Sequence, residues 1–422
     1  GYAWGSAITR MPSALGQGYR PANIANPGVK WETQEQWNLG LDLSFLNNRI
    51  NFTADAYIKT SKDMLMSLQL PSYMGTQGNG SSALAAPKGN YGEIQNKGLE
   101  LEIRALPFVG DFEWETSFQI SFNKNKLVAL SGTQNANLAG YGQWNDVVSV
   151  SEIGQPLYNF YGYVTDGVYQ NYEDLLTSPK TSQFPSDGVF NKGNTVWVGD
   201  VKYKDISGPD GVPDGIIDEH DRTVIGNPMP DFTFGFNNTF RWKNFDLNIF
   251  FNGSYGNDVM NYLSINLTNM KSTWTNQLNS VGDRAILVPC DPNKVYPDGQ
   301  SWKDDVTNIM VANPGAKIPA AHLNDPADND RISDRYIEDG SYIRLKNITL
   351  GYTLEKKWLK ALHLENVRFY VNLQNIYTWT KYKGYDPEVG ASTQDSSGLV
   401  YGLDYGRYPS PATYSFGLNV TF

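Results

Sequence analysis

Apolar and small polar side chains alternate strictly along residues 412–422, which read ATYSFGLNVTF. Successive side chains of a β-strand point to opposite faces, so one face of this segment is apolar and aromatic and the other is small and polar. Two environments suit such a strand. One is a sandwich, with a core on one side and water on the other, and the other is a transmembrane barrel, with lipid outside and a wet lumen inside. One strand does not distinguish them.

The same alternation recurs in pairs of segments, the pattern of β-hairpins. The pairs are residues 37–45 with 50–58, 99–105 with 112–123, 232–240 with 245–251, and 348–354 with 367–373. The turn of the fourth pair is longer, and its sequence EKKWLKAL predicts a short helix over residues 355–362. Four pairs and the closing segment make at least nine strands. Each is about ten residues long, enough to cross a bilayer at a tilt.

The connections alternate between short turns and long segments, and residues 1–33, which show no period, are predicted to form a loop. The long connections are residues 60–90, 124–230, 256–340 and 376–410. Short turns at one end and long loops at the other are typical of outer-membrane barrels, whereas a sandwich has shorter strands. The charged residues of the polar faces suit a water-filled lumen: Asp42, Asp55, Glu100, Glu102, Arg104, Glu113 and Glu115. The predicted fold class is all-β, an antiparallel transmembrane β-barrel with long extracellular loops.

Composition excludes several other classes of protein. The formal net charge of -10 argues against a nucleic-acid partner, which needs a basic face. The single cysteine, Cys290, excludes an internal disulfide framework. The three histidines lie far apart in sequence, and no nucleophile elbow, Walker loop or dinucleotide fingerprint is present, so we expect no enzyme. The chain lacks an initiator methionine, and we expect it to be a piece of a longer protein.

Ten stretches resemble the carboxy-terminal part of the SusC/RagA family of TonB-dependent outer-membrane transporters. They follow the family's order and span nearly the whole chain. They are residues 26–32 (NPGVKWE), 45–49 (FLNNR), 96–98 (NKG), 123–126 (NKNK), 160–163 (FYGY), 221–228 (DRTVIGNP), 341–352 (SYIRLKNITLGY), 374–380 (QNIYTWT), 384–388 (GYDPE) and 419–422 (NVTF).

The resemblance implies that residues 1–422 are the carboxy-terminal part, about ten strands, of one barrel domain of about 22 strands with a plug in its lumen. The plug and the amino-terminal strands lie outside this chain. The implied function is active import of oligosaccharides or other large nutrients, with a SusD-like lipoprotein as lid and with energy from TonB. The implied partners are that lipoprotein, TonB, the rest of the barrel and outer-membrane lipid. Import of oligopeptides, or a passive structural or adhesive surface barrel, is the alternative.

One acidic loop, DISGPDGVPDGIIDEHD, predicts a structural Ca²⁺ site, because this hard cation takes six to eight oxygen ligands. With Asp210 as the first position of a calcium loop, Asp214, Asp218 and Asp221 fall at the fifth, ninth and twelfth, and Ile216 supplies its carbonyl oxygen at the seventh. The third position is Val212, so Asp205 or Ser207 would have to fold back to compensate. The alternative is an acidic β-turn without a metal.

Aromatic residues of the long loops are candidate ligand contacts, since flat rings beside amide and carboxylate groups suit sugar faces and peptide backbones alike. The alternative for each is that it packs within the loops or against a lid. The candidates are Trp144, Trp197, Trp274, Trp302, Tyr401 and Tyr405.

Overall fold

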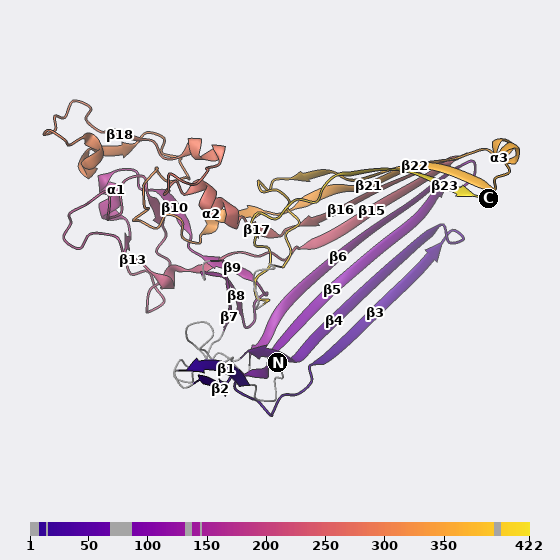
Figure 1. Ribbon diagram of the computed structural model, residues 1–422, viewed down its shortest axis with the longest axis horizontal. Helices are drawn as coiled ribbons and strands as arrows, with labels where there is room; N and C mark the ends of the chain where they lie inside the picture. Colours follow the sequence, from indigo (N-terminus) through magenta and orange to yellow (C-terminus); the bar gives the residue numbers. More distant parts are fainter. Residues whose placement is uncertain (1–7, 14–15, 68–86, 131–136, 144–145, 392–397) are drawn as a thin grey trace.

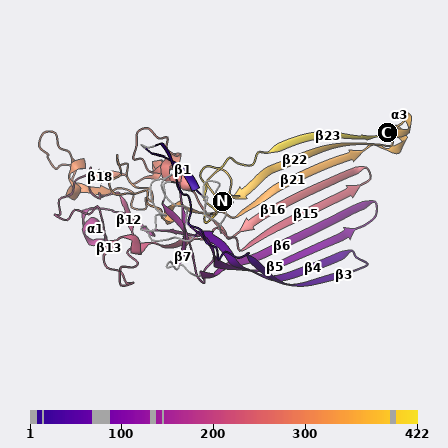
Figure 2. The same cartoon turned by 60° about the horizontal axis from the view of Figure 1, so that its bottom comes forward.

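The computed structural model describes residues 8–13, 16–67, 87–130, 137–143, 146–391 and 398–422. Its main element is a curved nine-stranded antiparallel sheet, with the long connections gathered at one end and the short turns at the other (Figure 1). The strands are neighbours in the sheet in the same order as along the chain (Figure 2). They are β3 (Thr33–Phe45), β4 (Ile50–Ser67), β5 (Lys88–Phe108), β6 (Phe112–Leu130), β15 (Phe232–Trp242), β16 (Phe245–Tyr255), β21 (Tyr342–Thr353), β22 (Asn366–Thr380) and β23 (Thr413–Thr421).

These nine strands and their hairpins confirm the predicted strand pattern. The strands extend further at the long-loop end than the alternation indicated, because both faces become polar there and the two-residue period disappears; β5 begins at Lys88 rather than at Leu99. At the short-turn end, Leu46, Asn47 and Asn48 adopt positive φ in one turn and Lys243 does so in another. The predicted helix is present as α3 (Lys356–Leu362), and it ends at His363 with a φ of 55°.

One face of the sheet is a band without charge. It consists of alternate residues of 37–45, 50–58, 99–105, 112–122, 232–242, 245–251, 348–352, 367–373 and 414–420, and none of these alternate residues is Asp, Glu, Lys or Arg. Its rings contact one another across strands, as Trp114 and Phe240 do with centroids 5.9 Å apart. The one amide in the band, that of Asn238, accepts a hydrogen bond from Trp114 Nε1 at 3.1 Å. Phe416 is 81% exposed, so this face lacks the protein cover that a soluble sandwich would give it.

The buried core lies in the long connections. One cluster includes Tyr169, Leu175, Trp197 and Ile309, and a second includes Phe160, Met260, Tyr262 and Leu403. The strands of this assembly are β7 (Asn137–Tyr141), β8 (Val147–Glu152), β9 (Asn159–Gly162), β10 (Thr165–Val168), β11 (Lys180–Thr181), β12 (Val201–Tyr203), β13 (Ile216–Ile217), β14 (Thr223–Gly226), β17 (Asp258–Met260), β18 (Leu287–Pro289), β19 (Ile309–Val311) and β20 (Ile337–Asp339). Its α-helices are α1 (Tyr172–Thr177) and α2 (Tyr262–Thr268), and its 3₁₀ turns are η3 (Glu219–Asp221), η4 (Asn279–Asp283), η5 (Trp302–Asp304), η6 (Val306–Asn308) and η7 (Asp334–Tyr336).

Two expectations need correction. The first 33 residues are not all loop, because β1 (Ile8–Ser13) and β2 (Gly16–Pro21) form an antiparallel hairpin. The long connections are not open loops but a folded assembly with cores of its own. The hairpin and the loop assembly both consist of short segments whose sequences show no two-residue period. Hydrophobic periodicity therefore does not predict them. No helix in the described part of the chain is long and apolar enough to cross a membrane.

The two faces of β5 predict opposite tolerance to a charge. Leu101 lies in the apolar band between Ala54 and Ile120, and Glu102 follows it on the polar face. We expect Leu101→Arg in the full-length protein to lower the free energy of unfolding in lipid vesicles by about 2–4 kcal/mol, the cost of an arginine near the middle of a bilayer. The matched control Glu102→Arg is expected to change it by less than about 1 kcal/mol. Denaturant titration in vesicles measures both, and equal losses would contradict a lipid-facing band.

Candidate functional site

The polar face of the sheet is the candidate functional surface, because hollows open along it. Three of them have volumes of about 870, 570 and 330 Å³. Asp246 and Arg368 line the largest, and Asp55 and Glu100 line both of the others. The face is rich in amides and hydroxyls that bond across strands, as Tyr57 Oη does to Asn123 Oδ1 at 3.1 Å. The wall is therefore wettable along its length.

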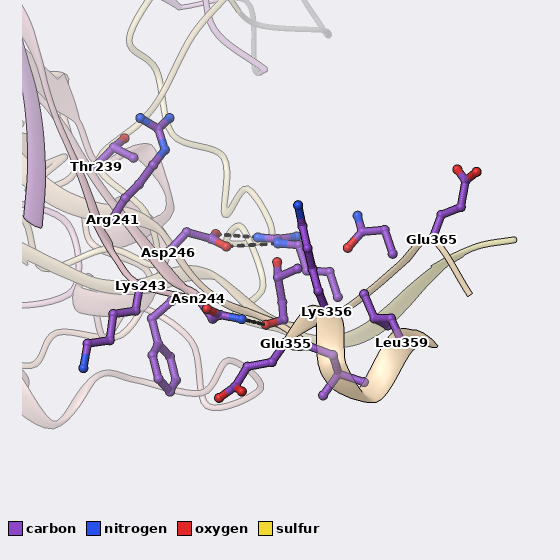
Figure 3. A pocket seen from close by; sticks show the side chains of 14 residues that line it. Thr239, Arg241, Lys243, Asn244, Asp246, Glu355, Lys356, Leu359 and Glu365 are labelled. Carbon is purple, nitrogen blue, oxygen red and sulfur yellow. Dashed lines mark hydrogen bonds and ion pairs between the residues drawn. The ribbon is translucent and has the colours of Figure 1, made fainter. Parts of the chain in front are cut away.

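The largest hollow lies at the short-turn end beside α3, and an ion pair crosses its wall (Figure 3). Arg368 of β22 donates from Nε to Asp246 Oδ1 at 3.0 Å and from Nη2 to Oδ2 at 2.5 Å. These residues are on strands that are not neighbours, since β21 runs between them. Gly351 of β21 makes the reach possible: a Cβ there would lie 2.3 Å from Arg368 Nη2. A glycine on the polar face thus has a steric purpose.

Some charges of this wall are paired across strands, whereas others, such as Asp55 and Glu100, form no ion pair within the described residues. Arg104 of β5 pairs with Glu115 of β6, and Arg241 of β15 lies 3.6 Å from Glu113 and 3.9 Å from Glu115. Asp42 accepts a hydrogen bond from the Thr53 hydroxyl at 2.7 Å. Carboxylates held in such ladders serve to order and hydrate the wall.

At the long-loop end, a buried ion cluster fixes the last connection to the sheet. Arg344 of β21 is 2% exposed. Its Nη2 donates to Asp386 Oδ1 at 2.5 Å, its Nη1 to Glu388 Oε2 at 2.7 Å and its Nε to Thr378 Oγ1 at 2.9 Å. Burial raises the pKa of Asp386, but hydrogen bonds from the Glu388 and Ser410 amides and from Arg344 outweigh it and leave that pKa below its ordinary value. The cluster joins the segments SYIRLKN and GYDPE.

The connection that this cluster holds then enters the loop core. The Met260 amide donates to the Gly402 carbonyl at 3.0 Å, and the Asp404 amide donates to the Met260 carbonyl at 2.9 Å. Asp404 also accepts from the Tyr382 hydroxyl at 2.6 Å. Leu403 is part of the cluster around Phe160. The last connection therefore couples β21 and β22 to the assembly above the lumen.

A second buried polar group, within the loop assembly, was not predicted. Asn329 Nδ2 donates to Asp200 Oδ1 at 2.9 Å and to Asp325 Oδ1 at 2.6 Å. Burial raises the pKa of Asp325 to about 6. Burial lowers the pKa of His322, but the nearby Asp200 carboxylate outweighs it and the net direction is upward. These residues lie 129 positions apart at most, so no local spacing could have indicated the group.

The five predicted calcium ligands have different surroundings in the structure. Asp210 is exposed and lies outside the hydrogen-bond network of the loop. Asp221 is fully buried and accepts from the Ile206, Ser207 and Asp218 amides. Asp214 accepts from the Ile216 amide, and Asp218 accepts from the His220 amide. Within the described residues no three His, Cys, Asp or Glu side chains are placed to hold one metal ion.

Asp205 folds back into this loop, the compensation that the sequence required. Its Oδ2 accepts from the Gly215 amide at 2.5 Å, and its Oδ1 is buried without a hydrogen-bond partner. A cation would satisfy such an oxygen. Calcium binding therefore stays a prediction, with Asp205 in place of Asp210 as the first ligand.

The described aromatic candidates do not form one surface. Trp197 is 2% exposed in a core cluster, and Trp302 packs against the same cluster. Tyr401 faces Tyr158 with ring centroids 6.0 Å apart, and Tyr405 packs against the second cluster. These four aromatic residues pack within the loop assembly, which was the alternative to a ligand contact. Trp274 is 93% exposed and is the one described candidate with a free ring, while Trp144 lies outside the described residues.

Arg344→Met tests the buried ion cluster. It leaves Asp386 buried without its cation, which we expect to lower the local stability of the last connection by about 3–5 kcal/mol. The loss would appear as faster amide hydrogen exchange over residues 398–412 of the full-length protein. The control Arg241→Met removes a half-exposed arginine with longer ion-pair distances and is expected to cost about 0–1 kcal/mol. Unchanged exchange in Arg344→Met would contradict the anchoring role.

Calcium binding to the acidic loop can be measured by the same method. We expect Ca²⁺ at a hundredfold excess over its dissociation constant to stabilise residues 205–221 against exchange by up to about 2.7 kcal/mol relative to chelator. Asp205→Asn is expected to abolish the effect and Asp210→Asn to leave it intact. Identical exchange with Ca²⁺ and with chelator would show that the loop is a metal-free turn.

Comparison with known proteins identifies the family. The family model described as TonB dependent receptor-like, beta-barrel matches residues 2–376. TonB-dependent receptor P3 of Formosa agariphila is 34% identical over 406 residues, which are 95% of this chain and 35% of that protein. TonB-dependent receptor SusC of Bacteroides thetaiotaomicron is 29% identical over 402 residues, 94% of this chain and 32% of that protein.

A solved structure shares the fold. The structure of the RagAB peptide transporter matches with a TM-score of 0.71 at 19% identity, covering 100% of this chain and 38% of that one. This chain spans about a third of the length of the curated relatives it matches. It forms part of a transmembrane barrel located in the outer membrane. The chain belongs to the β-barrel family of TonB-dependent receptors, of the SusC/RagA type.

Proposed function

We propose that the receptor containing this chain imports a large polar solute, in the first instance an oligosaccharide, across the outer membrane. In this proposal a SusD-like lipoprotein covers the extracellular side and TonB supplies the energy. The supporting observation is the polar wall that runs the length of nine strands, from the hollow beside α3 to the loop assembly.

The chemistry of the wall favours an uncharged, hydroxyl-rich solute. Its arginines Arg104, Arg241 and Arg368 are each paired with a carboxylate, and amides and hydroxyls lie along the same wall. Amides and hydroxyls donate and accept hydrogen bonds, as sugar hydroxyls do. A strongly charged solute would instead compete with the ion pairs of Arg104, Arg241 and Arg368.

Oligopeptide import is the second candidate. The solved structure with the same fold is described as a peptide transporter, and a peptide backbone presents the same donors and acceptors as a polar wall. At 19% identity the likeness extends to the fold alone. A passive structural or adhesive barrel is the third candidate, and it needs no energy source.

Uptake by cells that express the full-length receptor separates the three candidates. We expect oligosaccharides to co-purify with the receptor and its lipoprotein, to be identified by mass spectrometry, and to enter cells only when TonB is present. Co-purifying peptides with the same TonB dependence would replace the sugar by the peptide. Entry that is indifferent to TonB and to a protonophore, or the absence of any uptake, would contradict active import.

The exposed ring of Trp274 provides a variant for the same assay. If Trp274 stacks on the solute, Trp274→Ala is expected to weaken binding about tenfold, equivalent to about 1.4 kcal/mol. Trp358→Ala is the matched control, because Trp358 is also exposed but lies in α3 at the opposite end of the sheet. Equal effects of the two changes would exclude Trp274 as a ligand contact.

A further inference from the structure

Three lysines lie on the outward face of β5 and β6, on the long-loop side of the apolar band. Lys97 and Lys124 are direct cross-strand partners, and Lys126 follows two residues after Lys124 and so shares its face. All three side chains are exposed. They form a compact basic group on the face that carries the apolar band.

The register places this group directly beyond the band. Leu99 and Phe122 are partners within the band, and Lys97 and Lys124 are the next pair on the same face. Two residues of a strand span about 7 Å, so the lysine backbone lies within one side-chain length of the last apolar pair. On β4 and β3 the same row continues with Ile58 and Trp37. Lysine at such a boundary extends its ammonium group toward the aqueous side while its stem covers apolar surface.

The charges of this group are not neutralised by the protein. None of the three lysines forms an ion pair within the described part of the chain, whereas Lys62, on the neighbouring strand β4, pairs with Glu35 at 2.8 Å. Like charges directly opposite each other on adjacent strands destabilise a sheet. The pair Lys97 and Lys124 therefore favours an anionic partner from outside the chain.

We propose that Lys97, Lys124 and Lys126 bind the phosphate groups of the phosphorylated glycolipid in the outer leaflet of the outer membrane. The group lies on the surface that faces lipid, on the side of the band where the extracellular loops begin. Clustered lysines at that depth attract anionic head groups. An acidic protein partner fits less well, because the lysines continue the lipid-facing surface and not the top of the loop assembly. The proposal does not depend on which solute the receptor transports.

The full-length receptor in phosphatidylcholine nanodiscs, with and without bisphosphorylated lipid A, provides the test. We expect lipid A to raise the melting temperature of the wild type, and to raise it much less in the triple variant Lys97→Gln, Lys124→Gln, Lys126→Gln. The matched control carries the same loss of charge in the loop assembly, at Lys204, Lys317 and Lys383, which are all exposed. It should respond to lipid A as the wild type does. Dephosphorylated lipid A should leave all three proteins unchanged.

A second measurement separates binding from a structural role. In neutral detergent without lipid A, the triple variant should melt at the wild-type temperature or above it, because the opposition of Lys97 and Lys124 is removed. A lower melting temperature there, or an undiminished response to lipid A, would overturn the proposal. A triple variant that no longer binds the lipoprotein but responds to lipid A as the wild type does would also overturn the proposal. That result would assign the three lysines to a protein partner.

Discussion

A backbone N–H or C=O group that faces hydrocarbon must be paired within the protein, because lipid offers no hydrogen bonds. The rest of this structure depends on that constraint. Register is continuous from β3 to β23 through eight antiparallel pairings, with only local bulges. The outer strands β3 and β23 each have one neighbour within the described residues, as expected of part of a larger barrel. The same constraint accounts for the uncharged band, since a charge there would also lack a partner.

Once the backbone is paired in this way, the two faces take on separate tasks. The outward face packs its rings against one another across strands and is otherwise covered by lipid, so many of these rings are exposed in the chain itself. The polar face must remain ordered while wet, and it does so through cross-strand ion pairs such as Arg368 with Asp246 above Gly351. The long connections lie beyond the end of the sheet, so neither of its faces can bury their apolar side chains. They build cores of their own and attach to the sheet through buried contacts, among them Arg344 with Asp386.

The contrast between strand and loop explains how much the sequence could predict. Strand positions, their faces and the helix α3 follow from the two-residue period and from local turn residues, and the structure confirms them. The loop assembly combines segments more than a hundred residues apart, as the contact of Asn329 with Asp200 shows, and no local period records such pairing. The same limit affected the candidate site. Arg344 and Asp386 both lie in stretches singled out by resemblance, yet their contact needs the fold. The aromatic candidates share a residue type, but residue type does not reveal whether a ring is buried. Trp197 is buried in a core cluster of the loop assembly.

The separation of the two faces can be measured directly along one strand. Single nitroxide labels at successive positions of 112–122 in β6 of the full-length receptor, reconstituted in vesicles, report access to oxygen from lipid and to a nickel chelate from water. We expect strict two-residue alternation, with oxygen access highest at even positions such as Phe118 and chelate access highest at odd positions such as Gln119. Uniform access along the strand, or the opposite phase, would contradict it.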